Sequence, residues 1–325
     1  MRAIFIALLL LGICARTGSL HAGPGATIDH IPGALLEMIA KAPSGCERDI
    51  LYTFRQASLG NDVSVLTAGL RYKGCLDAYS RIESTPDQLE DPEVYTEKRM
   101  DILYLYISAF GKTTAEKVRV QLAAARPFSK ILLDLRWNGG GILGRPSSED
   151  REGLGVLGVA ELFAPLAAAP IITLSVQDKV GVRSVVYRAR ARGPYADIPV
   201  AVLVDKHTAS ASEILAGALL LWYEDTLHIV GERTYGKGVF TNVSRDSGVD
   251  VVLTGGGFVV GQIGGRSLSI QGNGIRPTIL VADPTPPLTP LEPRYDPAAE
   301  IGLWLLGDTS DYSTGGHPLS SPWVR

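Results

Sequence analysis

The feature that most constrains the fold is the alternation of short apolar segments with helical stretches between residues 102 and 230. The segments 102–107, 130–135 and 200–204 are dominated by aliphatic and aromatic side chains, a composition typical of strands. A helix is expected over 210–223, shortly after the last of these segments. Strands that alternate with helices predict an α/β domain.

Further elements extend this pattern. A helix is expected to contain residues 154–168, and strands are expected over 170–176 and 185–191. A short strand over 228–230 and a hairpin between 239 and 260 complete the prediction.

Four regions are expected along the 325 residues. Residues 1–22 read as a signal peptide, and residues 23–100 as a mostly helical region without obvious chemistry. Residues 101–285 form the α/β core, and residues 286–325 form a proline-rich segment and tail.

The N-terminus has the features of a secretory signal peptide. Arg2 supplies a positive charge, and the apolar run Ala3–Ala15 is too short to span a bilayer. Cleavage is expected after Ala22, which leaves a secreted or periplasmic protein without a membrane span. Lipidation of Cys14 is the alternative, because residues 11–14 resemble a lipobox, although with a bulky residue at its third position.

Cysteine content and charge indicate the compartment and the kind of partner. Signal cleavage would leave Cys46 and Cys75, and an oxidising compartment favours a disulfide between them over two buried free thiols. The formal net charge is -3, from 31 basic and 34 acidic residues, and no basic run stands out. The charge pattern therefore indicates no nucleic-acid partner.

Two segments could place backbone amides beside a reacting group. The strand 130–135 runs into Asn138-Gly139-Gly140-Gly141, the glycine turn, where a ligand can approach the backbone without side-chain obstruction; an ordinary turn is the alternative. Residues 208–213, the serine segment, place Ser210 at the start of a helix. Free amides and the helix dipole there would face a developing oxyanion, whereas a simple helix cap is the alternative.

Residues 231–238, the lysine loop, almost match a phosphate-binding loop. Gly238 stands where Ser or Thr would hold magnesium, and a strand rather than a helix is expected next, so nucleotide binding is rejected. Lys237 lies between two glycines and could be laid against a crowded site, where burial would lower its pKa and make it a usable base. A surface lysine in a turn is the alternative reading. Ser–Lys pairs are a known arrangement of nucleophile and base.

Together these segments resemble the C-terminal processing (tail-specific) serine peptidase family. The family shows Asp-Leu-Arg before an Asn-Pro-Gly-Gly turn, then Ser-Ala-Ser-Glu, then Gly-Glu-x-Thr-Phe/Tyr-Gly-Lys-Gly. The chain has these in the same order, from Asp134, Ser210 and Gly231, and residues 270–277 and 76–81 resemble two further family segments. The resemblance implies a ClpP/crotonase-like spiral of β-β-α units with a small N-terminal helical region, in which residues 101–285 are the peptidase core.

The resemblance also implies roles for the matching positions. Ser210 matches the nucleophile, Lys237 its general base, and the backbone amides of Ala211 and Gly141 the oxyanion hole; Ser212 is the second choice of nucleophile. The reaction would be acyl transfer at a peptide carbonyl, without a metal or other cofactor. The expected substrates are exported proteins or peptides, cut near their C-termini.

The chain departs from the family pattern near the expected site. The separation of Ser210 and Lys237, 27 positions, is slightly longer than expected. Thr241 stands where the family often has a Gln that orients the lysine, and Gly139 replaces the Pro of the turn. His207 is interpreted as incidental. Asp134 and Arg136 are expected to make structural ion pairs.

A larger departure concerns substrate selection. Most family members carry a peptide-binding PDZ domain before the first core strand, but only Arg81 to Asp101 lies there, which is too short for one. Substrate tails would then be selected by the core itself or by an adaptor partner. Related domains bind ligands without catalysis, so a non-catalytic binding module of the same fold is the alternative function.

Overall fold

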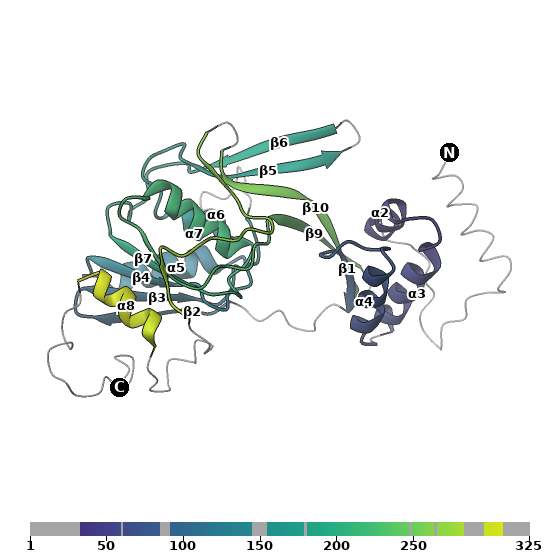
Figure 1. Cartoon of the computed structure of the whole chain (residues 1–325), viewed down its shortest axis with the longest axis horizontal. Helices are drawn as coiled ribbons and strands as arrows, with labels where there is room; N and C mark the ends of the chain where they lie inside the picture. The colour runs from purple at the N-terminus through teal and green to yellow at the C-terminus, as the bar shows by residue number, and fades with distance from the viewer. Residues whose placement is uncertain are drawn as a thin grey trace. The chain divides into compact units, whose positions relative to one another are not determined.

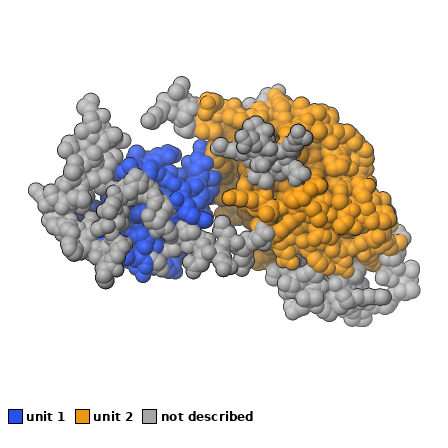
Figure 2. Space-filling view, turned by 180° about the vertical axis from the view of Figure 1, so that it is seen from behind, with its two compact units in different colours: residues 1–88, 241–255 blue, residues 89–240, 256–325 orange. Residues whose placement is uncertain are grey.

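The computed structural model describes residues 33–59, 61–84, 92–144, 155–178, 181–246, 249–262, 265–282 and 296–307. They belong to two compact units, coloured separately in Figure 2. The small unit comprises Met1–Gln88 and Thr241–Gly255, and the large unit comprises Leu89–Phe240 and Gly256–Arg325. The expected signal peptide lies outside the described residues. Among the described helices, none has the length and apolar character that a membrane crossing requires.

The small unit packs three helices and a short strand around its own core. These elements are α2 (Gly33–Lys41), α3 (Glu47–Ser58), α4 (Ser64–Tyr72) and β1 (Arg81–Ser84). The strand β1 pairs antiparallel with the first half of β10 (Val249–Gly261). The disulfide expected between Cys46 and Cys75 is present and closes a separation of 29 residues.

The large unit is built on a six-stranded sheet in the order β12-β8-β7-β4-β3-β2. Its strands are β2 (Val94–Arg99), β3 (Ile102–Ile107), β4 (Lys130–Asp134), β7 (Val200–Val204), β8 (His228–Gly231) and β12 (Ile279–Leu280). All neighbouring pairs are parallel except β2 with β3, which is antiparallel. The predicted α/β class is thus confirmed for this unit.

Helices cover both faces of this sheet (Figure 1). They are α5 (Thr114–Ala124), α6 (Gly155–Glu161) and α7 (Ala211–Trp222) on one face and α8 (Pro297–Leu305) on the other. The period-two alternation of a strand explains this arrangement. In β7, Val200, Val202 and Val204 pack toward the first face, and Ala201 and Leu203 pack toward α8.

A second, antiparallel sheet contains the remaining strands. In the large unit, β5 (Pro170–Asp178) pairs with β6 (Gly181–Arg188) and with the second half of β10, which also pairs with β11 (Ser267–Ser269). The strand β9 (Val239–Asp246) pairs with β10, so the hairpin expected between 239 and 260 is present.

Two elements differ from the sequence prediction. The helix expected through Ala168 ends at Glu161, because Pro165 lacks an N–H and cannot continue a helix. The strand expected over 185–191 lies earlier, at Gly181–Arg188, since the hairpin with β5 fixes its register.

Candidate active site

The three segments with chemistry follow three neighbouring parallel strands. The glycine turn follows β4, the serine segment follows β7, and the lysine loop continues from β8. These strands are adjacent in the order β8-β7-β4. Because the carboxyl ends of parallel strands meet at one edge of a sheet, the three segments emerge together, where α/β proteins usually place their sites.

Ser210 lies at a strained turn at the start of α7. It is the N-cap residue, with φ 56° and ψ -113°, a backbone conformation that non-glycine residues rarely adopt. Its backbone N–H donates to the Glu213 carboxylate at 2.8 Å, and the residue is partly exposed. The next residue, Ala211, is the first of the helix, so its N–H has no acceptor within the helix.

The second candidate nucleophile, Ser212, has a different environment. It is fully buried, and its hydroxyl donates to the backbone carbonyl of Asn138 at 2.8 Å. A hydroxyl held in this way does not face an incoming substrate. The geometry therefore favours Ser210 over Ser212.

Asn138 organises the glycine turn and fastens it to the serine segment. Its buried side chain donates to the Ile107 carbonyl at 2.8 Å and accepts from the Gly140 N–H at 2.9 Å. Its own carbonyl accepts from the Ala209 N–H at 3.0 Å. These three hydrogen bonds fix the conformation of the turn and its position against the serine segment.

Glycine is required at two positions of this turn. Gly140 has φ +106°, and a Cβ there would lie 2.8 Å from the Cβ of Ser210 and 3.0 Å from the backbone nitrogen of Ala211. Gly141 has φ +136°, and a Cβ there would lie 2.2 Å from the carbonyl oxygen of Phe110. The absence of side chains thus lets the turn lie directly against the candidate nucleophile.

The Glu213 carboxylate joins the serine segment to the lysine loop. Its Oε2 accepts from the backbone N–H groups of Ser210 at 2.8 Å and Lys237 at 2.9 Å. Its Oε1 accepts from the Thr234 hydroxyl at 2.6 Å and the Gly236 N–H at 2.7 Å. Because both N–H groups bind the same oxygen, the distance between the backbone nitrogens of Ser210 and Lys237 cannot exceed the sum of these two hydrogen-bond lengths.

A second set of contacts holds the lysine loop from its other side. The Gly238 N–H donates to the Gln271 side chain at 2.8 Å, and the Gly272 N–H donates to the Gly236 carbonyl at 2.9 Å. Lys237 is partly buried between these anchors. A strand, β9, follows the loop, as expected from the sequence. Thr241 lies on β9 and belongs to the small unit.

Aromatic side chains lie beside these segments. The rings of Trp137 and His207 stack with centroids 3.9 Å apart, and Trp137 remains 44% exposed. Asp205 accepts from the backbone N–H groups of both residues, at 3.1 and 2.9 Å. Tyr235, in the lysine loop, is 62% exposed. These rings give the site an apolar rim that a substrate side chain could cover.

Asp134 and Arg136 make the structural ion pairs expected of them. Arg136 is buried and donates through Nη2 to Asp134 and to Asp296, both at 2.6 Å, which ties the end of β4 to the N-cap of α8. Burial lowers the pKa of Arg136, but the two carboxylates outweigh it and hold that pKa well above its ordinary value. Burial and the adjacent Asp134 raise the pKa of Tyr104, whose hydroxyl donates to Asp134 at 2.8 Å.

Sequence reasoning missed the roles of Glu213, Asn138 and Thr234. From the sequence alone, Glu213 is only the residue at the third position of the helix, where a capping box requires Glu or Gln. The bond to Ser210 is of this local kind, but those to the lysine loop join residues more than twenty positions apart. One sequence signal pointed to Glu213: the same acidic residue belongs to both the capping pattern and the family's Ser-Ala-Ser-Glu motif.

Comparison with known proteins identifies the family of the chain. The model of peptidase family S41 matches residues 101–281. A chloroplastic C-terminal processing peptidase from Tetradesmus obliquus is 32% identical over 158 residues, which cover 46% of this chain and 30% of the relative. The carboxy-terminal processing protease CtpA of Bacillus subtilis (strain 168) is 30% identical over 172 residues, which cover 52% of this chain and 33% of the relative. The chain thus matches a third or less of the length of these curated relatives.

One solved structure of similar fold covers most of this chain. A lipoprotein from Streptococcus agalactiae gives a TM-score of 0.52 at 16% identity and covers 85% of this chain and 97% of that one. A photosystem II D1 C-terminal processing protease gives a TM-score of 0.42 at 25% identity and covers 61% of this chain and 44% of that one. The expected ClpP/crotonase-like fold is confirmed, and the chain belongs to peptidase family S41.

Proposed function

We propose that the chain is a serine endopeptidase in which Ser210 is the nucleophile and Lys237 the general base. The observation that carries the proposal is the Glu213 carboxylate, which accepts hydrogen bonds from the backbone of both residues. This shared anchor holds the backbones of the two residues, 27 positions apart in the sequence, close together at one edge of the sheet, which supports their pairing as nucleophile and base.

In the proposed mechanism, neutral Lys237 takes the proton from the Ser210 hydroxyl as its oxygen attacks a peptide carbonyl. The backbone amides of Ala211 and Gly141 donate to the oxyanion of the tetrahedral intermediate. The amine product leaves, and water then hydrolyses the acyl-enzyme. The strained backbone at Ser210 is typical of functional sites, where the surrounding structure holds an unfavourable conformation.

We infer that the substrates are exported proteins, cut near their C-termini. The relatives' names describe carboxyl-terminal processing, which supports the choice of substrate end. The Cys46–Cys75 disulfide supports an oxidising compartment, outside the cytoplasm. The structural similarity to a lipoprotein agrees with export.

The test is hydrolysis of an unfolded protein by the purified chain. Ser210→Ala and Lys237→Ala should each remove nearly all activity, because residues that act as one unit fail together. The matched controls Ser184→Ala and Lys98→Ala change exposed residues on β6 and β2, outside the site, and should retain activity. The rate should rise between pH 7 and 9, since a lysine base acts only when neutral and its ordinary pKa is about 10.4.

Two outcomes would replace this proposal. Activity that survives Ser210→Ala and disappears in Ser212→Ala would transfer the nucleophile to Ser212. Binding of unfolded protein without turnover, unchanged in the Ser210→Ala and Lys237→Ala variants, would identify a non-catalytic binding module.

A further inference from the structure

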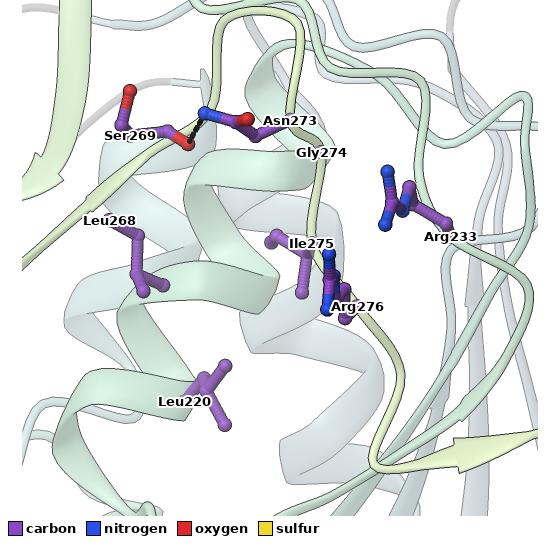
Figure 3. Close-up of a pocket in the computed structure, with 8 residues that line it drawn as sticks. All are labelled: Leu220, Arg233, Leu268, Ser269, Asn273, Gly274, Ile275 and Arg276. Carbon is purple, nitrogen blue, oxygen red and sulfur yellow. Dashed lines mark hydrogen bonds between the residues drawn. The ribbon is translucent and has the colours of Figure 1, made fainter.

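A pocket of about 340 Å³ lies in the large unit beside the lysine loop. Its apolar wall comes from Leu220 of α7, Leu268 of β11 and Ile275 (Figure 3). In the view of Figure 3, Arg233 and Arg276 lie on the opposite side from Leu220 and Leu268. The volume is at the lower end of the range for small-ligand sites, which suits a terminal residue rather than a long segment.

The charge of this pocket is unbalanced. Arg233 and Arg276 are exposed, and neither makes an ion pair or a hydrogen bond with any other described residue. Glu232 is adjacent in sequence, but its carboxylate makes no ion pair within the described ranges, and its buried Oε2 has no hydrogen-bond partner there. The pocket therefore presents two guanidinium groups next to an apolar wall, which fits a carboxylate attached to an apolar side chain.

The Asn273 amide of the pocket is already engaged. The Asn273 side chain donates to the Ser269 carbonyl at 3.2 Å, as the dashed line in Figure 3 marks. The two arginines are consequently the groups best able to take an anionic partner.

We infer that this pocket binds the C-terminal residue of a peptide substrate, with its α-carboxylate between Arg233 and Arg276 and its side chain against the apolar wall. The inference rests on the proposed peptidase function and adds the site that selects the substrate's end. A free C-terminus is the one place in a polypeptide where a carboxylate belongs to a residue with an apolar side chain.

The pocket is built from the segments that hold the candidate base. The Thr234 N–H donates to the Ile275 carbonyl at 3.1 Å, and the Ile275 N–H donates to the Thr234 hydroxyl at 2.7 Å. The Thr234 hydroxyl in turn donates to Glu213 at 2.6 Å. Lys237 follows Arg233 by four residues, so about 14 Å of chain at most separates their Cα atoms. A terminus held at Arg233 is thus anchored on the same loop as Lys237.

The test compares three synthetic peptides, which differ only in the last residue or its terminal group, on the full chain carrying Ser210→Ala, which removes turnover from the measurement. One peptide ends in leucine with a free carboxylate, the second is its C-terminal amide, and the third is an amide whose last residue is glutamate. Calorimetric titration should show the free acid binding roughly tenfold more tightly than either amide, since a charged hydrogen bond contributes about that factor. The third peptide separates a terminal carboxylate from one on a side chain.

Variants connect this preference to the pocket. Arg233→Gln and Arg276→Gln should each reduce the preference for the free acid, and the double variant should abolish it. The control Arg48→Gln removes an exposed arginine of α3, which does not line the pocket, and should keep the full preference. Thermal unfolding of each variant checks that the fold is retained.

Three results would overturn the inference: equal binding of acid and amide, equal binding of the glutamate amide and the acid, or a preference that persists in the double variant. The same peptides incubated with the chain retaining Ser210 separate this question from the proposed function. Cleavage of acid and amide at equal rates would remove the pocket's role and leave the peptidase proposal standing. A binding preference without any cleavage would support the pocket and contradict the peptidase proposal.

Discussion

At the scale of single residues, Glu213 is the side chain on which the proposed site depends most. It is fully buried, and its two oxygens accept from four donors, three of them backbone N–H groups. A buried carboxylate normally carries a large desolvation cost, which such a set of donors offsets. Because four donors converge on this one buried carboxylate, a small change there moves both Ser210 and Lys237.

Glu213→Gln should therefore impair activity more than stability. The amide nitrogen of Gln donates instead of accepting, so it would face two of these N–H or O–H donors. We expect a loss of about 2 kcal/mol in the free energy of unfolding. We also expect kcat to fall at a temperature where the variant is fully folded.

The matched control is Glu224→Gln, which changes an exposed carboxylate paired with Arg266. Surface pairs of this kind contribute little, so both stability and kcat should remain near wild type. Equal kcat values in Glu213→Gln and wild type would rule out a positioning role for Glu213.

Asp77 should make the stability of the small unit depend on pH. Burial raises the pKa of Asp77, but hydrogen bonds from Ser80, Tyr79 and Thr254 outweigh it and lower that pKa below its ordinary value. A lowered pKa in the folded state adds stability that is present above about pH 4 and is lost as pH falls through the folded-state pKa. Urea unfolding at pH 6 and pH 3 should show this loss, and Asp77→Asn should reduce it. Identical acid sensitivity in the two proteins would contradict the assignment.

At the scale of elements, the sequence was sufficient wherever local rules decide. The strands at 102–107 and 200–204 lie where their apolar composition predicts, and α7 begins directly after Ser210 as its capping pattern predicts. Prediction failed at β6, whose register is fixed by pairing with β5 rather than by its own residues. The contacts between the serine segment and the lysine loop also depend on pairing between strands that are distant in sequence. Local patterns do not predict such contacts, so only the family resemblance brought the two segments together.

The glycine turn offers a matched pair of substitutions. In Gly140→Ala the new Cβ would lie 2.8 Å from both the Ala209 carbonyl oxygen and the Ser210 Cβ, at a φ of +106°. The turn or the nucleophile must then move, and a displacement of about 1 Å can reduce a rate on the order of 100-fold. Gly139→Ala adds the same methyl group where no atom lies within 4 Å, so kcat/KM should stay near wild type. Equal activity of the two variants would show that the turn need not lie against Ser210.

At the scale of the whole molecule, each of the two units has its own hydrophobic packing, which in the large unit lies on both faces of the sheet. The small unit's core combines α2, α3 and α4 with Val249, Val251 and Leu253 of β10. The helices and the hairpin were each predictable from local pattern. Their common core was not, because it joins segments more than 160 positions apart, and no local periodicity encodes such packing.

Separate cores predict separate responses to reduction. The Cys46–Cys75 disulfide lies in the small unit, and because its cysteines are 29 positions apart it should stabilise that unit by about 3–4 kcal/mol. Reduction should therefore lower the small unit's unfolding temperature by on the order of 10 °C or more. The large unit has no cysteine, so its transition should not move. Differential scanning calorimetry of the purified chain with and without reductant would resolve the two transitions, and hydrogen exchange would assign each to its unit. The double variant Cys46→Ala/Cys75→Ala should reproduce the reduced profile and show no further response to reductant.

A single transition that shifts as a whole would mean that the two units unfold as one cooperative structure, because destabilising one unit would then destabilise both.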